Sequence, residues 1–419
     1  MLKLYNIIMS FKKVIIYIPV ILFLMLLPNF NAKSEITGNA SVWGGNSTNA
    51  FYVDSVGSTM ISGIGLGLNY EVANSNWNYF LEMNYYNYNS FNERNFLNTS
   101  LGFNMIKPLD KDDINFLNIN GFLSSRFDGI EYNIYDYWQP LVSINYYHYF
   151  STNTFLSANY TPRMRFYSNY SEINYLENSV SLTYKTYFKT KTTLNINTSI
   201  MQKNYFNSHA SNVMNPGIVT PKKKSDASIQ KKTKWGKIIK GYSSKDTSTN
   251  MNNMVQSDIS PSQFVFNGKI SQNVTENVGL AFNLGYSTNL YSKSSDSLQG
   301  VSSYAGEEEL FDDSYSFENI SISPTLTVVL PNTIIGKLNY FQATKNYNYL
   351  VEIENEDQVL RKDDFKMLTL SFSRYFNLKD SFFYQIFLTL DYSYYTNNSN
   401  TYIFDYDNQD LYLTLQVQF

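Results

Sequence analysis

The last segment of the chain has apolar and polar residues in strict alternation. Between Leu411 and Phe419 the sequence reads LYLTLQVQF, with an apolar residue at every second position. Because successive side chains of a β-strand point to opposite faces, this period of two indicates a strand with one apolar face. The apolar face contains Leu411, Leu413, Leu415, Val417 and Phe419.

The same period of two recurs along the rest of the chain. We count about sixteen alternating segments between residues 36 and 419, separated by polar connections. No apolar run after residue 32 reaches the roughly 20 residues that a membrane-spanning helix requires. Strands cross lipid as a closed barrel, because an open sheet leaves backbone groups unsatisfied there. We therefore expect an all-β fold: a transmembrane antiparallel up-and-down β-barrel of about sixteen strands over residues 33–419.

The connections between these segments alternate in length. Outer-membrane barrels have short periplasmic turns and long external loops, and an even number of strands leaves both termini on the periplasmic side. The alternation therefore predicts which end of the barrel is external. Short connections lie near Ala73, Pro108, Ser151, Lys189, Thr275, Pro331 and Asn377, and longer ones span 45–59, 126–137, 206–261, 291–315, 346–363 and 395–407.

The first 32 residues have the order of a secretory signal. Lys12 and Lys13 precede the apolar run 14–27, and a small residue, Ala32, follows it. We expect residues 1–32 to be a signal peptide that is cleaved near Ala32. The alternative is a permanent membrane anchor, for which the apolar run is short.

Composition excludes several other classes of protein. Aromatic residues make up 17% of the chain, with 37 Tyr and 30 Phe, while charged residues make up 16% and the formal net charge is -3. The charge balance argues against a nucleic-acid partner. The absence of Cys excludes a disulfide framework, a thiol nucleophile and a Cys-based metal site. Abundant Tyr and Phe are typical of the two interfacial girdles of a membrane barrel.

The alternating segments and the final strand ending in Phe419 together resemble porin-like bacterial outer-membrane β-barrels, over essentially all of residues 33–419. This resemblance is one of architecture and names no subfamily. It implies passive diffusion of small hydrophilic solutes across the outer membrane of a Gram-negative bacterium. It also implies contact with outer-membrane lipid, and assembly by the barrel-assembly machinery with the final strand as the signal. A homo-oligomer is common among such barrels, but the sequence does not require one.

Charged residues occupy several predicted inward positions. Among them Arg and Lys outnumber Asp and Glu, and the remaining inward residues are mostly Ser, Thr and Asn. We expect these charges to line a water-filled pore that prefers anions. The alternative is that they are solvated residues in a wide lumen, or contacts of a plug. The predicted pore-lining residues are Glu82, Arg126, Arg163, Arg165, Lys185, Lys269, Lys337 and Asp391.

The chain offers little material for enzymatic chemistry. Its two histidines are His148, expected on the lipid-facing register at the periplasmic end, and His209, in the long connection. We therefore expect no catalytic residue, no metal site, no cofactor and no enzymatic activity. Two rival functions stay open: a surface binding or secretion-accessory barrel without an open pore, and a barrel hydrolase that uses His148.

Three prolines inside predicted strands raise a rival fold, because proline interrupts a hydrogen-bonded ladder. Pro140, Pro162 and Pro324 would be compatible with a soluble β-protein. A 22-stranded transporter with a plug would need a longer chain.

The connection 206–261 is rich in lysine and far longer than neighbouring strands require. Acidic residues gather in the next two long connections, around Glu308 and Glu354. Opposite charges on neighbouring loops lead us to expect an external lid, and the alternative is a solvated basic tract. The lysines are Lys222, Lys223, Lys224, Lys231, Lys232, Lys234, Lys237, Lys240 and Lys245.

Overall fold

We describe a computed structural model of the chain in nine ranges: 35–50, 58–112, 114–169, 171–206, 260–291, 313–352, 358–378, 382–401 and 404–419. The expected signal peptide, His209 and the Lys-rich tract lie outside these ranges, as do Glu308 and Glu354. None of the helices in the described ranges is long and apolar enough to cross a membrane.

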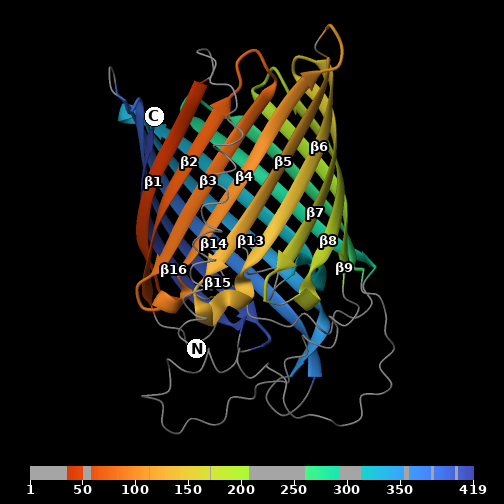
Figure 1. Cartoon of the computed structure of the whole chain (residues 1–419), viewed down its shortest axis with the longest axis vertical. Helices are drawn as coiled ribbons and strands as arrows, with labels where there is room; N and C mark the ends of the chain where they lie inside the picture. Colours follow the sequence, from red (N-terminus) through yellow and green to blue (C-terminus); the bar gives the residue numbers. More distant parts are fainter. Residues whose placement is uncertain are drawn as a thin grey trace, which may run out of the picture.

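The described residues form one closed antiparallel barrel of sixteen strands (Figure 1). Each strand pairs with its neighbours in sequence, and β1 pairs with β16 to close the sheet. This confirms the predicted fold class and strand number. The strands are β1 (Glu35–Ser47), β2 (Thr59–Glu71), β3 (Trp77–Tyr88), β4 (Phe96–Pro108), β5 (Asn115–Asp128), β6 (Tyr137–Ser151), β7 (Thr154–Tyr167), β8 (Tyr175–Tyr187), β9 (Thr192–Tyr205), β10 (Ser262–Asn273), β11 (Val278–Tyr291), β12 (Phe317–Leu330), β13 (Ile334–Glu352), β14 (Gln358–Asn377), β15 (Gln385–Ser399) and β16 (Tyr406–Gln418).

The two ends of the barrel differ in the length of their connections. One end, at the top of Figure 1, carries the short turns and the C-terminus, and we call it the short-turn end. The other carries the longer segments, and we call it the long-connection end. Short 3-10 helices lie in four of these longer segments and in one short turn: η1 (Asn92–Arg94), η2 (Ile130–Tyr135), η3 (Ser171–Ile173), η4 (Ser314–Ser316) and, in the turn, η5 (Pro331–Thr333).

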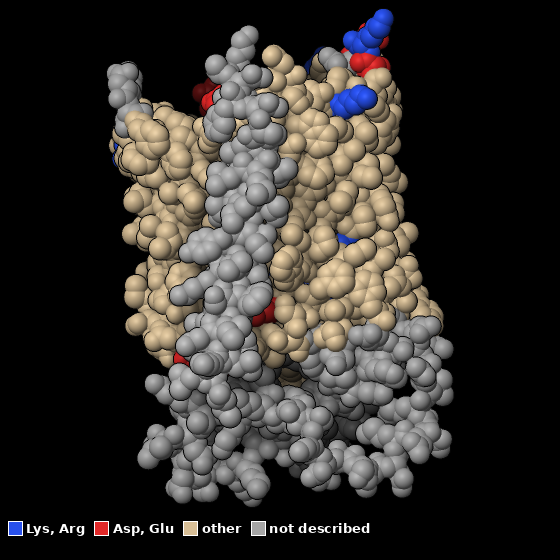
Figure 2. All heavy atoms as spheres, in the orientation of Figure 1, with Lys and Arg blue, Asp and Glu red and all other residues tan. Residues whose placement is uncertain are grey.

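The outer surface of the barrel is apolar because the period of two holds along the strands. In β16, Leu411, Leu413 and Leu415 are 49%, 52% and 44% exposed, while Tyr412 and Thr414 between them are half-buried. Since adjacent side chains of a strand point to opposite faces, the intervening residues face the interior. Figure 2 shows that most of the wall visible in that view is uncharged, and charged residues gather toward its ends.

The three prolines lie within strands that remain paired. Pro140 is opposite Leu123 of β5, and Pro324 is opposite Phe282 of β11. Toward the other neighbouring strand, each proline lies where regular pairing is interrupted. Pro140 and Pro162 interrupt the β6–β7 pair, and Pro324 interrupts the β12–β13 pair. A strand therefore tolerates proline here because it loses a ladder position toward one neighbour only.

Candidate functional site: the barrel interior

All the sequence-predicted pore residues lie on strands at inward positions, but the structure divides them into two groups. Arg126, Arg163 and Arg165 are near the long-connection end, where they are partly or completely buried. The others lie on the inner wall closer to the middle or the short-turn end. We call this second group the open wall: Glu82 on β3, Lys185 on β8, Lys269 on β10, Lys337 on β13 and Asp391 on β15.

Arg126 is enclosed by a carboxylate and two aromatic rings. Its Nε lies 2.7 Å from Asp128 Oδ2, its Nη2 lies 2.8 Å from Asp128 Oδ1, and the side chain is 1% exposed. Its guanidinium carbon is 3.8 Å from the centroid of the Phe96 ring and 5.3 Å from that of Tyr135 in η2. The Asp128 amide donates to Asp136 Oδ1 at 2.6 Å, which ties the strand end to the connection. Two-point pairing of this kind compensates the desolvation of both charges.

The same arrangement recurs on the far side of the barrel at Arg361 and Asp363 of β14. Both residues are buried, and Arg361 Nε lies 3.0 Å from Asp363 Oδ1. The guanidinium lies between the ring of Tyr347, at 4.0 Å, and that of Phe404 in the β15–β16 connection, at 3.4 Å. Asn397 donates to both Asp363 Oδ2 and the Phe404 carbonyl, so the connection is held from two sides.

A third buried pair joins residues that are far apart in sequence. Lys203 at the end of β9 pairs with Asp313, which precedes η4, and both side chains are buried. The Lys203 ammonium also lies 4.3 Å from the Tyr175 ring and 5.3 Å from the Tyr315 ring. Burial, together with the negative charges of Glu177 and Asp313, raises the pKa of Tyr315 above its ordinary range, so the phenol stays protonated.

Two arginines of β7 extend this arrangement, and their partners lie on the neighbouring strands β8 and β6. Arg163 Nη2 pairs with Glu177 Oε2 at 2.9 Å, and Arg165 donates to Gln139 Oε1 from Nε at 2.8 Å and from Nη2 at 2.6 Å. The Arg165 guanidinium is 4.3 Å from the Tyr137 ring.

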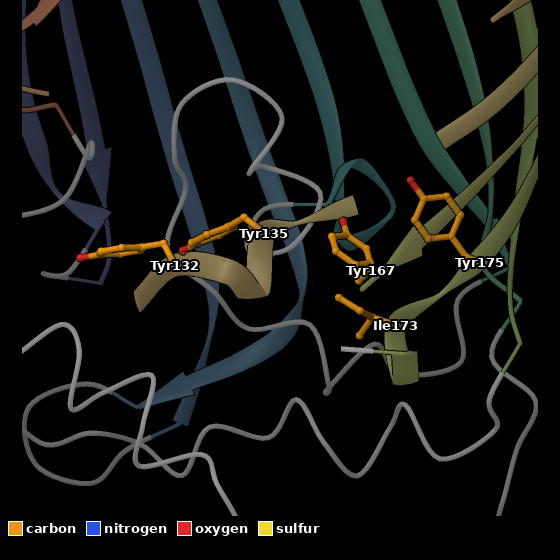
Figure 3. Packing of buried hydrophobic residues seen from close by; sticks show 5 residues of the cluster. All are labelled: Tyr132, Tyr135, Tyr167, Ile173 and Tyr175. Atoms are coloured by element: carbon orange, nitrogen blue, oxygen red, sulfur yellow. The ribbon is translucent and has the colours of Figure 1, made fainter. Parts of the chain in front are cut away.

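Loop arginine and tyrosine residues join the same layer. Arg94 of η1 is 4% exposed and lies 4.6 Å from the Tyr132 ring and 4.8 Å from the Tyr135 ring, both in η2. Figure 3 shows Tyr132 and Tyr135 beside Tyr167, Ile173 and Tyr175, which form one buried cluster.

We call this packed layer at the long-connection end the rim belt. Its cations stabilise contacts between strands and the connections that follow or face them. Its effect is to hold η1, η2, η4 and Phe404 against the barrel wall. The rim belt contains Arg94, Arg126, Asp128, Arg163, Arg165, Glu177, Lys203, Asp313, Arg361 and Asp363 with their aromatic neighbours.

The open wall is different, because its charges are not enclosed. Within the described ranges no salt bridge joins Glu82, Lys185, Lys269, Lys337 or Asp391 to another charged group. Lys269 and Lys337 are exposed, and Lys185 lies 4.8 Å from the Tyr187 ring. Uncharged polar residues occupy the wall between them.

These uncharged residues form local amide and hydroxyl networks. Asn159 donates to Ser143 Oγ at 2.7 Å and to Asn145 Oδ1 at 2.6 Å. Asn339 donates to Ser323 Oγ and Thr325 Oγ1, both at 2.8 Å. Such short polar side chains can both donate hydrogen bonds to water and accept them.

Two acids that were not among the predicted pore-lining residues also lie at inward positions. They are Asp128, which pairs with Arg126, and Glu177, which pairs with Arg163, and each neutralises the charge of its partner. One signal was present in the sequence: Arg126-Phe127-Asp128 and Arg361-Lys362-Asp363 both place a cation and an acid two positions apart. Residues two apart in a strand share a face, so this spacing predicts a pair.

His148 lies at the short-turn end of β6, on the outer face. Its Nδ1 is 2.9 Å from Asn115 Oδ1, and its ring meets that of Phe150 edge-on at 4.7 Å. Nearby, desolvation acts to raise the pKa of Asp110, but hydrogen bonds from Ile114 and Asn115 outweigh it and lower that pKa below its ordinary value. In the described ranges no group of three His, Cys, Asp or Glu residues could hold a metal ion.

Comparisons with known proteins find similar barrels at very low sequence identity. No family model and no curated protein matches the chain. Among solved structures, Pseudomonas aeruginosa OprD is 7% identical with a TM-score of 0.46, covering 93% of this chain and 96% of its own. Acinetobacter baumannii OccAB1 is 9% identical, with a TM-score of 0.46 and coverage of 94% and 98%. A bacterial polysaccharide outer-membrane secretin is 8% identical, with a TM-score of 0.42 and coverage of 91% and 97%.

At this level of similarity the neighbouring structures give no information about solutes. The fold class is therefore assigned from the geometry of this barrel. The described residues form a closed sixteen-stranded antiparallel barrel with an apolar outer face and a polar inner face. The predicted resemblance to porin-like outer-membrane barrels is therefore confirmed as a resemblance of architecture.

Proposed function

We propose that this protein is an outer-membrane channel for passive diffusion of small hydrophilic solutes. The supporting observation is that both faces of single strands are exposed, with opposite polarity. In β13, Lys337 on the inner face and Leu338 on the outer face are both exposed. An exposed, charged inner face favours water in the lumen, while the exposed apolar outer face favours lipid.

The dimensions of the wall support a membrane location. Thirteen residues, the length of β16, rise about 3.3 Å each, and at a tilt of about 40° they span roughly 30 Å. That is enough for an outer-membrane apolar band of about 25 Å. At the long-connection end, Asp364 and Lys366 form a partly exposed outward pair at 3.1 Å, as expected beyond the edge of such a band.

The ion preference that we propose is a mild preference for anions. It rests on the open wall, where three lysines face two acids, whereas the rim belt cations are largely paired. The test is the reversal potential of the purified protein in planar bilayers under a salt gradient. A cation-selective pore would contradict the preference, and a barrel without conductance would contradict the channel.

The second candidate is a surface binding or secretion-accessory barrel without an open pore. The packing of the rim belt at one end favours it, since aromatic connections there lie against the wall. The same bilayer measurement separates the two, because such a barrel would insert without conducting. A barrel hydrolase has less support: His148 is on the outer face and bonded to Asn115. Hydrolysis of phospholipid or peptide by the purified protein, and its loss in His148→Ala, would support the hydrolase.

We further propose export by a signal peptide in residues 1–32 and recognition of the final strand, ending in Phe419, by the barrel-assembly machinery. The regular outward row Leu411, Leu413 and Leu415 supports the second part. Deleting Phe419 should reduce insertion more than export, measured by membrane fractionation.

A further inference from the structure

Arg374 is a cation on the apolar outer face of β14. Strand alternation places it on the same face as Leu370, Phe372 and Phe376, which are 38%, 38% and 37% exposed. Its partner across the β14–β15 pair is Leu388, also an exposed apolar residue. Arg374 therefore lies among side chains that are suited to lipid.

No acid compensates this charge within the described ranges. Its Nε is buried and has no hydrogen-bond partner there, and no salt bridge involves the residue. Among the other charged residues at outward positions of the strand, Asp364 and Lys366 pair with each other farther along toward the long-connection end, and Lys362 is exposed still nearer that end. An unpaired charge beside lipid is unfavourable, so such side chains extend toward the interface and find a partner there.

The side chain of Arg374 extends in that direction. Its guanidinium carbon lies 4.6 Å from the centroid of the Phe376 ring, and Phe376 is nearer the short-turn end of β14. Beyond it, the β14–β15 turn carries Phe382, which is 74% exposed, and Tyr384. Exposed aromatic residues at the end of a membrane barrel are typical of the interfacial girdle.

We propose that Arg374 binds the phosphate of a phospholipid in the leaflet at the short-turn end. The proposal rests on the membrane location proposed above. A guanidinium presents several donors in a plane that matches phosphate oxygens, and the Phe376 ring holds it from one side. Leu370 and Phe372 lie below it on the same face, where acyl chains would pack.

Native mass spectrometry of the full barrel extracted from mixed vesicles tests this proposal. We expect retention of one phosphatidylglycerol over phosphatidylcholine by about fivefold, since the choline group already neutralises its own phosphate. Arg374→Gln should bring the two lipids to parity. Added inorganic phosphate should not displace the lipid, whereas displacement would assign the site to free phosphate.

The matched control is Lys337→Gln, which removes one positive charge from the inner face of the neighbouring strand. It should leave the lipid preference unchanged. Equal loss in both variants, or no preference in the wild-type barrel, would overturn the proposal. A second measurement is the urea midpoint of unfolding in vesicles: phosphatidylglycerol should raise it for the wild type and for Lys337→Gln but not for Arg374→Gln.

Failure of the channel and failure of the lipid site are distinguishable. A barrel that inserts in vesicles without conductance but retains phosphatidylglycerol contradicts the channel alone. A conducting barrel without lipid preference contradicts the lipid site alone.

Discussion

The rim belt and the open wall both contain inward charges, but those of the rim belt are buried and paired, whereas those of the open wall are not enclosed. Arg126 and Arg361 are nearly inaccessible, each bonded to a carboxylate and stacked on aromatic rings. Lys269 and Lys337 are exposed and have no acid partner in the described ranges. Buried charges require partners because desolvation is expensive, whereas solvated charges do not. The position of a residue along the barrel axis therefore decides whether its charge is buried against a partner or exposed on the inner wall.

The largest expected effect is on stability at the rim belt. Asp128→Asn removes the charge that Arg126 is paired with and leaves a buried cation, which should reduce the free energy of unfolding by about 3–5 kcal/mol. Urea titration in lipid vesicles measures it. The control is Asp391→Asn on the open wall, for which we expect a change within about 0.5 kcal/mol. Similar losses in both variants would remove the distinction between the two regions.

The next effect tests which side chains of β16 face outward and which face inward, because the comparison depends on that assignment. Leu415→Arg places a charge in the apolar outer face of β16 and should cost roughly 2–4 kcal/mol near the membrane midplane. Gln416→Arg places it on the inner face and should have almost no effect, because water reaches it. Equal damage from the two substitutions in the same unfolding assay would contradict the register.

A smaller effect isolates the aromatic component of the rim belt. Phe404→Leu keeps an apolar side chain but removes the ring that lies 3.4 Å from the Arg361 guanidinium. Buried contacts of this kind contribute about 0.5–2 kcal/mol, so the loss should be in that range. Phe188→Leu, at a turn position where the side chain is 49% exposed, is the control and should be nearly neutral in urea titration.

The smallest effect concerns the open wall. The double variant Lys269→Gln, Lys337→Gln should shift the reversal potential in the direction of cation selectivity. The reason is that Glu82 and Asp391 then outnumber the remaining lysine of the open wall. The shift should fade at high salt, since the screening length falls from about 10 Å at 0.1 M to about 3 Å at 1 M. Arg163→Gln should shift it less, as Glu177 already neutralises that residue. A larger shift from Arg163→Gln than from the two lysines would reverse the roles of the regions.

The sequence predicted the strands and their faces because the period of two is a local property. Leu411 to Leu415, and the inward positions of Arg163 and Arg165, followed from alternation alone. The partners of the rim belt did not follow from alternation, since Lys203 and Asp313 are 110 positions apart in the sequence and meet only in the folded sheet. Arg374 was also missed, because a cation after Phe372 interrupts the apolar pattern that marks a lipid-facing strand.

The prolines also mark strand pairs that have fewer ladder positions than their neighbours. Pro140 and Pro162 both interrupt the β6–β7 pair, whereas the β1–β16 pair that closes the cylinder is regular from Asn39 to Ser47. Amide hydrogens near the interruptions should exchange with solvent before those of the closing pair. Strands β6 and β7 are joined by the short connection at residues 152–153, so their ends at the short-turn end stay close together when the strands separate locally. We therefore expect local opening at the β6–β7 pair, and at the β12–β13 pair that Pro324 interrupts, before opening of the pair that closes the cylinder.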